Sequence, residues 1–226
     1  MAAVTAGSAK EMLLVHGRPV IQWAIDEALD AEVESLVVVS APEKQDLNSF
    51  VQASPYAIQL EMQYVANGLA PAVALAARPE PTLVILPDTL YYPKLPSRRI
   101  ARALSEGYDI AILTQKVSES DMSKYGIVET DDQGEIRRIF EKPMPTATTS
   151  RNAVAARFGL SARMMGFLLE ALDSLKDEPG EIQLTPILNL ALKNGYNAIA
   201  LPARSDETRY DCGSEQGYRS ALEQIA

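Results

Sequence analysis

The sequence has almost no cysteine or histidine, and this scarcity excludes several kinds of site. Its 226 residues include one cysteine, Cys212, and one histidine, His16. A single cysteine cannot form an intrachain disulfide, and neither residue type is numerous enough for a Cys-rich or multi-His metal site. A catalytic group of the Ser-His-Asp or Cys-His kind would have to use His16. No partner pattern surrounds His16, so we interpret it as structural, and we interpret Cys212 as a small packed thiol.

Long apolar runs are also missing. The longest uninterrupted apolar segments are short, as at residues 36–39, 83–86 and 110–113, whereas a membrane-spanning helix needs about 18 apolar residues. The N-terminal segment has no charged region followed by an apolar stretch, which a secretory signal requires. We therefore expect a cytoplasmic protein that does not enter a membrane.

Positive charge is in short supply. Lys and Arg number 21 against 30 Asp and Glu, so the formal net charge is −9. Non-specific nucleic-acid binding needs positive charge to neutralise phosphates, and this balance argues against it. A small anionic ligand held by a few local cations is still compatible with the composition. The G-x-G-x-x-G and Walker A phosphate-binding fingerprints are both absent.

Helical and strand patterns alternate along the chain, whose length suits one large domain or slightly more. Apolar spacing predicts helices over residues 20–31, 43–52, 71–77, 98–106, 162–174, 185–193 and 213–224. Strands are predicted over residues 35–39, 57–64, 82–86, 110–113, 126–129, 136–140, 153–160 and 197–201, with a hairpin turn at 131–134 and a loop at 144–150. The alternation up to residue 115 predicts a parallel α/β sheet, and the remainder predicts an α+β elaboration of it.

Two aspartates and several cations are candidates for chemistry. Asp88 follows a buried strand, where a carboxylate with Mg²⁺ commonly handles phosphate. From position alone, a turn aspartate is the simpler interpretation. Asp211 alone is most simply a helix N-cap or a turn residue. Lys10, Lys142 and Arg157 are scattered cations, and a lone lysine is usually a solvated surface charge.

Read in order, several motifs resemble one family, and the resemblance covers nearly the whole chain. These blocks are similar to those of bacterial UTP–glucose-1-phosphate uridylyltransferases: KEMLLVHGRPVIQWAIDEAL (Lys10–Leu29), LPD (Leu86–Asp88), YGIV (Tyr125–Val128), EKP (Glu141–Pro143), ARFGLS (Ala156–Ser161), GEIQLT (Gly180–Thr185) and YDCGSEQGY (Tyr210–Tyr218). The last two blocks together are quite specific for uridylyltransferases among sugar nucleotidyltransferases.

The resemblance implies a fold and a reaction. The fold would be a Rossmann-like α/β domain over residues 1–226, with a mixed, mostly parallel sheet and helices on both faces. Residues 1–115 would form a nucleotide-binding half, and residues 116–226 a sugar-binding half with the C-terminal helix. UTP and glucose 1-phosphate would give UDP-glucose and pyrophosphate with Mg²⁺. The implied partners are a nucleoside triphosphate, a sugar 1-phosphate and further copies of the chain in a homo-oligomer.

The same resemblance assigns catalytic roles to individual residues. Asp88 and Asp211 match the two Mg²⁺ carboxylates of the family. Lys142 matches the lysine on the sugar phosphate, and Lys10 matches the lysine that neutralises the triphosphate.

Further residues match positions that bind the substrates. Glu141 and Gly126 match positions that line the sugar. Gly68 belongs to the block near the base, Pro87 to the strand-end motif, and Ala156 stands where the family has glycine; these three are also expected to bind substrate.

The chain departs from the family in two places. The family's phosphate loop, G-x-G-T-R-x-x-P-x-T-x-x-x-P-K, is mostly missing. Counting back from Lys10, Met1 falls directly after the arginine of that loop. We therefore expect either that residues 2–6 form a replacement strand or that the true protein starts earlier. The family's G-L-G-H-A-V block is GLAPAV here, at Gly68–Val73.

These departures leave a second function open. The chain would then be a non-catalytic or truncated relative that binds a sugar nucleotide or acts as a regulatory or assembly partner. The missing loop and the altered base block favour this alternative. The retained Asp88, Asp211, Glu141 and Lys142 favour the enzyme.

Overall fold

The computed structural model describes residues 9–175 and 180–225, so the replacement strand expected at residues 2–6 lies outside the described residues. Contacts divide the chain into two units. The first unit comprises Met1–Val65, Ile85–Arg98 and Arg204–Ala226, and the second comprises Ala66–Val84 and Arg99–Ala203. Each unit takes residues from both sides of position 115, so this division differs from the two halves that the sequence suggested.

The described residues of the first unit form three two-stranded sheets and the helices that cover them. Its elements are η1 (Lys10–Met12), β1 (Leu14–Val15), β2 (Arg18–Pro19), α2 (Val20–Asp30), β3 (Leu36–Ser40), α3 (Gln45–Gln52), β4 (Ile58–Met62), β6 (Thr89–Pro93), β12 (Glu207–Asp211) and α8 (Glu215–Gln224). Strands β3 and β4 pair in parallel, whereas β1 pairs with β2, and β6 with β12, in antiparallel fashion. His16 lies in the β1–β2 turn with a φ of 49°.

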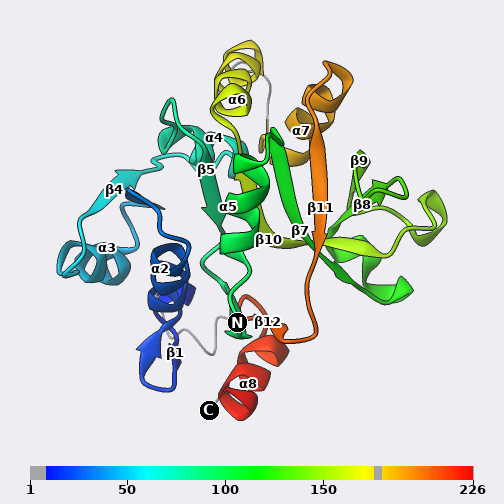
Figure 1. Cartoon of the computed structure of the whole chain (residues 1–226). Helices are drawn as coiled ribbons and strands as arrows, with labels where there is room; N and C mark the ends of the chain where they lie inside the picture. Colours follow the sequence, from blue (N-terminus) through cyan, green and yellow to red (C-terminus); the bar gives the residue numbers. More distant parts are fainter. Residues whose placement is uncertain (1–8, 176–179, 226) are drawn as a thin grey trace. The chain divides into compact units, whose positions relative to one another are not determined.

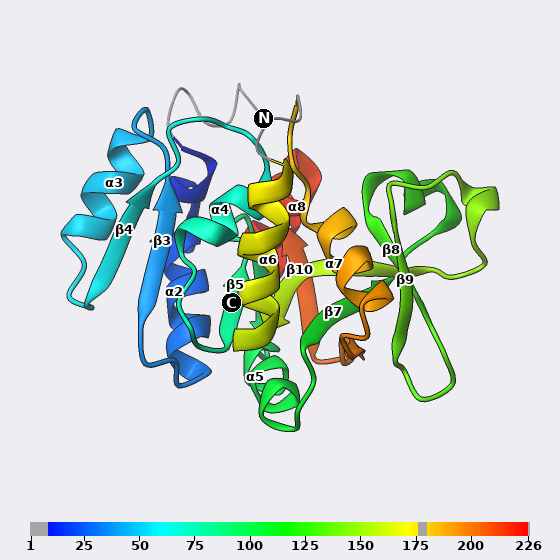
Figure 2. The ribbon, with the colours of Figure 1, turned by 90° about the horizontal axis from the view of Figure 1, so that it is seen from above.

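Two apolar clusters hold the first unit together. One joins Ile21 and Ile25 of α2 to Leu47 and Val51 of α3, and Figure 2 shows these helices beside the β3–β4 pair. The four residues follow helical spacing, which is why the sequence predicted both helices. The other cluster packs buried side chains of β6, β12, α2 and α8 together, and Figure 1 shows α8 beside β12.

The sequence patterns missed strands β6 and β12. The register of this pair sets Asp211 opposite Thr89, the residue after Asp88. Asp211 therefore ends a strand, and the interpretation of Asp211 as a helix N-cap is wrong. The N-cap of α8 is Ser214, whose hydroxyl oxygen accepts a hydrogen bond from the backbone N–H of Gly217 at 3.1 Å.

The second unit is built on one mixed sheet. Its strand order is β11 (Ala198–Pro202), β7 (Ile110–Lys116), β10 (Asn152–Leu160), β8 (Gly126–Thr130) and β9 (Ile136–Glu141), and β5 (Thr82–Ile85) also pairs with β10. Strand β7 runs parallel to β11 and antiparallel to β10. The other elements of the unit are α4 (Leu69–Leu75), η2 (Glu119–Lys124), η3 (Pro145–Ala147), α6 (Ala162–Leu175) and α7 (Leu184–Lys193), while α5 (Ser97–Ser105) begins in the first unit. The loop predicted at 144–150 contains η3.

Helices cover both faces of this sheet, which confirms the predicted fold class. Phe158 and Leu160 of β10 belong to a buried cluster with residues of α6 and α7. Gly159 lies between them in sequence and faces Ile100 and Leu104 of α5 instead, because successive strand residues point to opposite faces. Figure 1 shows α5 crossing the sheet. None of the described helices is both long and apolar enough to cross a membrane.

The predicted hairpin between β8 and β9 is confirmed. The Asp131 side chain accepts hydrogen bonds from the backbone N–H groups of Gln133 and Glu135, at 3.0 and 2.9 Å. Gly134 has a φ of 84°, a conformation that glycine adopts without a steric penalty. The turn residues thus supply the local bonds that the sequence suggested.

Cys212 is completely buried in the cluster that joins β6, β12, α2 and α8. Burial raises the pKa of its thiol to about 12, and the charges of Asp211 and Asp88 act in the same direction. A thiol that stays protonated is a poor nucleophile. The interpretation of Cys212 as a packed thiol agrees with this environment.

We expect Gly159→Ala to lower the free energy of unfolding by about 1–3 kcal/mol, because it overpacks the contact with α5. A Cβ at this position would lie 2.6 Å from Cγ2 of Ile100 and 3.1 Å from Cδ1 of Leu104. Gly166→Ala in α6 is the matched control: its Cβ meets nothing within 4 Å, so it should stabilise the helix slightly. Urea denaturation of both variants checks this, and equal effects would contradict it.

We expect iodoacetamide to leave Cys212 unmodified in the folded protein at mildly alkaline pH, and to alkylate it in denaturant. Folding raises the pKa of the thiol from 9.0 to about 12. The resulting contribution to stability is complete below pH 9.0 and is lost as the pH rises toward 12. Mass spectrometry measures the alkylation. Rapid modification of the folded chain would show that the thiol is not buried in solution.

Candidate functional site

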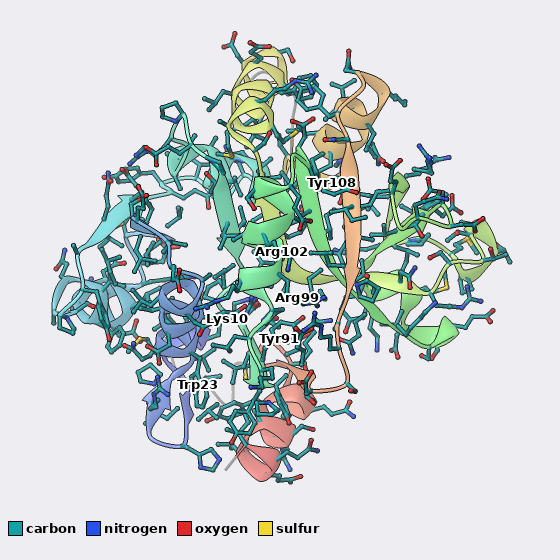
Figure 3. All side chains as sticks on the ribbon, viewed as in Figure 1. Lys10, Trp23, Tyr91, Arg99, Arg102 and Tyr108 are labelled. Atoms are coloured by element: carbon teal, nitrogen blue, oxygen red, sulfur yellow. The ribbon has the colours of Figure 1, made fainter. Side chains whose placement is uncertain are left out.

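Three charged side chains from distant segments meet in the first unit. Lys10 lies in η1, Asp88 in the connection between β5 and β6, and Asp211 at the end of β12. Nζ of Lys10, which is labelled in Figure 3, donates to Oδ2 of Asp88 at 2.5 Å. The pairing of β6 with β12 brings the segment after Asp88 alongside Asp211. The sequence resemblance had singled out all three residues.

Gly213 shows that the two carboxylates face the same small space. A Cβ built on Gly213 would lie 2.9 Å from Oδ1 of Asp211 and 3.0 Å from Oδ2 of Asp88. The backbone N–H of Gly213 also donates to Oδ1 of Asp211 at 3.0 Å, which fixes that carboxylate. Glycine therefore leaves a cradle between the two carboxylates, which we call the carboxylate pair.

Each carboxylate of the pair has one cation beside it. Burial lowers the pKa of the Lys10 ammonium, but its hydrogen bond to Asp88 and the charges of Asp88, Glu11 and Asp211 outweigh burial, so that the pKa is raised. Lys10 therefore stays charged beside Asp88, and Nη2 of Arg209 lies 3.5 Å from Oδ2 of Asp211. Oxygen ligands of this kind suit Mg²⁺, which usually binds through one or two carboxylates and keeps several waters. Among the described residues no group of three or more potential metal ligands occurs. The carboxylate pair, with its two ligands, fits the way in which Mg²⁺ usually binds.

The turn that carries Lys10 is anchored to α3. Glu11 is buried, and its Oε1 accepts from Nζ of Lys44 at 2.9 Å. The backbone N–H of Ala9 donates to Oδ2 of Asp46 at 3.1 Å. Sequence reasoning missed these anchors. Glu11 lies in the motif that contains Lys10, but nothing in the sequence around Lys44 and Asp46 pointed to this contact.

A second group of candidates gathers in the second unit, where β8 begins and β9 ends. The register pairs Gly126 with Glu141, and Oε2 of Glu141 accepts from Oγ1 of Thr185 at 2.7 Å. Lys142 follows with a φ of 44°, and its backbone N–H donates to the carbonyl of Tyr125 at 3.1 Å. We call Gly126, Glu141, Lys142 and Thr185 the β9-end group. Thr185 was missed as a site residue, although it ends the GEIQLT motif.

The remaining candidates occupy specialised backbone positions. Gly68 has a φ of 112°, and a Cβ there would overlap the backbone of Ile182. The backbone N–H of Ile182 donates to the carbonyl of Asn67 at 2.7 Å, so GLAPAV and GEIQLT lie side by side. Ala156 is buried with a φ of 61°, where the pairing of β10 with β7 shifts register. Pro87 lies in the first unit between β5 and β6.

Two solved structures of similar proteins share this fold. The structure titled UDP-glucose pyrophosphorylase complexed with UDP-glucose has a TM-score of 0.82 and 27% sequence identity, with 95% of this chain and 89% of that chain covered. An apo UDP-glucose pyrophosphorylase has a TM-score of 0.84 and 25% identity, with 99% and 92% covered.

Curated relatives agree with these structures. The UTP–glucose-1-phosphate uridylyltransferase of Pseudomonas aeruginosa is 27% identical, over 96% of this chain and 88% of the relative. The UTP–glucose-1-phosphate uridylyltransferase YngB of Bacillus subtilis is 28% identical, over 98% and 83%. The family model described as nucleotidyl transferase matches residues 1–226. The chain, which carries paired carboxylates and a lysine on such a fold, therefore belongs to the nucleotidyl transferase family.

Proposed function

We propose that this protein joins UTP and glucose 1-phosphate to give UDP-glucose and pyrophosphate. The relatives named UTP–glucose-1-phosphate uridylyltransferases support this proposal. The single observation that carries it is the meeting of Asp88 and Asp211 around the cradle at Gly213, with Lys10 bonded to Asp88. Two carboxylates and a lysine are the charges that a metal-bound triphosphate requires.

The reaction needs no protein nucleophile. An oxygen of the sugar phosphate attacks the α-phosphorus of UTP, a new P–O bond forms, and the bond to the pyrophosphate leaving group breaks. The protein contributes positioning and the neutralisation of charge on the phosphates. This chemistry is compatible with a buried Cys212 and with a His16 confined to a turn.

The first unit would hold the nucleotide phosphates and the metal. In this proposal Asp88 and Asp211 bind Mg²⁺, and Gly213 leaves the space for it. When bound, Mg²⁺ offsets negative charge on the phosphate oxygens. Lys10 bonds to Asp88 in the structure, and we infer that its ammonium moves to the triphosphate when that ligand is present. The anchors at Glu11 and Ala9 keep the turn in place during that exchange.

The second unit would hold the sugar phosphate and the base. A lysine is a compact point charge that suits a phosphate monoester, and Lys142 takes this role in the proposal. Glu141, held by Thr185, would accept hydrogen bonds from sugar hydroxyls, and Gly126, which pairs with it, would line the sugar. Gly68 would lie near the base. Pro87 and Ala156 complete the proposed substrate-binding set, and their specific contacts stay a prediction.

We expect Asp88→Asn and Asp211→Asn each to lower kcat by roughly 10²–10³-fold, the cost of removing one charge-stabilising group in other enzymes. Asp26→Asn is the control, since Asp26 lies in a half-buried ion pair with Arg18 that is not part of the candidate site, and it should leave kcat unchanged. Pyrophosphate release from UTP, glucose 1-phosphate and Mg²⁺ measures the rates. Full activity in either site variant would contradict the assignment. UDP-glucose binding by the unaltered chain without turnover would favour the non-catalytic alternative.

We expect Lys142→Ala to raise the KM for glucose 1-phosphate by roughly 10–100-fold, the loss of a charged hydrogen bond, with a smaller change in the KM for UTP. Lys10→Ala should show the reverse pattern, because Lys10 bonds to Asp88 of the carboxylate pair. Initial-rate kinetics with each substrate varied in turn separate the two effects. An equal rise in both KM values for Lys142→Ala would argue against a role on the sugar phosphate.

A further inference from the structure

A cavity of about 700 Å³ lies in the second unit, away from every residue of the candidate site. The start of β9, the end of α7 and the start of β11 line it, and Figure 1 shows these elements beside one another. Its volume falls within the roughly 300–1,000 Å³ that is common for small-molecule sites. We call it the α7 cavity. Its lining includes Arg138, Lys193 and Tyr196.

The cavity exists because β9 and β11 meet and then separate. Glu135, just before β9, forms an isolated antiparallel bridge with Ile199 of β11. Further along β9, Ile139 bonds to the side chain of Asn189 instead: its N–H donates to Oδ1 at 2.9 Å, and its carbonyl accepts from Nδ2 at 2.7 Å. The outer edge of β9 is thus bonded to a helix side chain at this point. The gap is therefore a fixed feature of the backbone.

Two of the three cations at this cavity have no acidic partner among the residues that the structure describes. Arg137 is neutralised by Asp131 and Glu135. Arg138 and Lys193 form no ion pair with an acid anywhere in residues 9–175 and 180–225, although the guanidinium carbon of Arg138 lies 4.4 Å from the ring centroid of Phe140. In a chain with a net charge of −9, two uncompensated cations on one cavity favour an anionic ligand.

An aromatic wall of the cavity is held rigidly. The guanidinium carbon of Arg163 lies 3.9 Å from the ring centroid of Tyr196, and the ring of Phe167 lies 4.9 Å from it, centroid to centroid. Arg163 is itself fixed by Asp109, whose Oδ2 accepts from its Nη1 at 2.8 Å. A wall that is already ordered lowers the entropic cost of binding.

We propose that the α7 cavity binds a small organic phosphate monoester. Its doubly charged phosphate would contact Arg138 and Lys193, and its organic part would lie against Tyr196. Two cations match the two negative charges of a monoester better than the single charge of a carboxylate. The volume also exceeds what a bare phosphate ion would fill. This site is separate from the proposed transferase reaction and does not depend on it.

Phenyl phosphate is a suitable probe, and isothermal titration calorimetry of the full chain measures its binding. We expect the double variant Arg138→Gln/Lys193→Gln to bind it at least about 10-fold more weakly, through the loss of charged hydrogen bonds. Both side chains are exposed, so folding should be unaffected. The matched control, Arg102→Gln/Lys116→Gln, removes two exposed cations that do not line the cavity, and it should keep the affinity of the unaltered chain. Lys142→Ala should keep it too.

Four results would overturn the proposal. Unchanged affinity in the cavity variant would exclude these cations as ligands, and an equal loss in the control variant would indicate only a general electrostatic effect. Loss of all binding in Lys142→Ala would place the phosphate in the β9-end group. Sodium benzoate that bound as tightly as phenyl phosphate would likewise refute the choice of a phosphate. No arm measures turnover, so a failure of the transferase proposal would be seen separately.

Discussion

The antiparallel pairing of β6 with β12 is the constraint on which the carboxylate pair depends. It connects residues far apart in sequence, and its register sets Asp211 opposite Thr89. The hydrogen-bonded pairing of the two strands therefore fixes the backbone positions from which both carboxylate side chains extend. The apolar cluster beneath it, with Leu90, Tyr210 and Cys212, supplies the burial that holds the two strands together. A shift of one residue would turn these buried side chains outward, so the packing of the core and the geometry of the site share one register.

Bringing two carboxylates to one place has an electrostatic cost, and the surrounding residues show how it is met. Lys10 bonds directly to Asp88, and its pKa is raised by these charges although burial opposes the shift. The same negative charges add to burial in raising the pKa of the adjacent Cys212 thiol. One arrangement thus keeps a lysine charged and a cysteine neutral. Such local repulsion is typical of functional sites, where stability is given up for chemistry.

Sequence reasoning found what local patterns determine and missed what long-range pairing determines. Helices α2 and α6 and strands β7 and β10 follow apolar periodicity, and the hairpin turn follows from Asp131 and Gly134. Strands β6 and β12 mix polar and aromatic residues, so no alternation marked them, and position alone suggested an N-cap or a turn residue for Asp211, which ends β12. The resemblance pointed to Asp88, Asp211 and Lys142, but Lys44 and Asp46 are half-buried polar residues at a helix start, which carry no sequence signal.

The contact between α7 and β9 shows why the β9-end group and the α7 cavity lie along one strand. Thr185, Asn189 and Lys193 recur every four residues, so they lie along one side of α7. Thr185 bonds to Glu141 and Asn189 to Ile139, while Lys193 reaches the α7 cavity. Four residues of α7 rise about 6 Å, and two residues of β9 advance about 6.6 Å. Every fourth residue of α7 therefore stays beside every second residue of β9 over this length. By sequence alone, such a polar row is the solvated side of an amphipathic helix. Here it follows β9 from the β9-end group to the cavity.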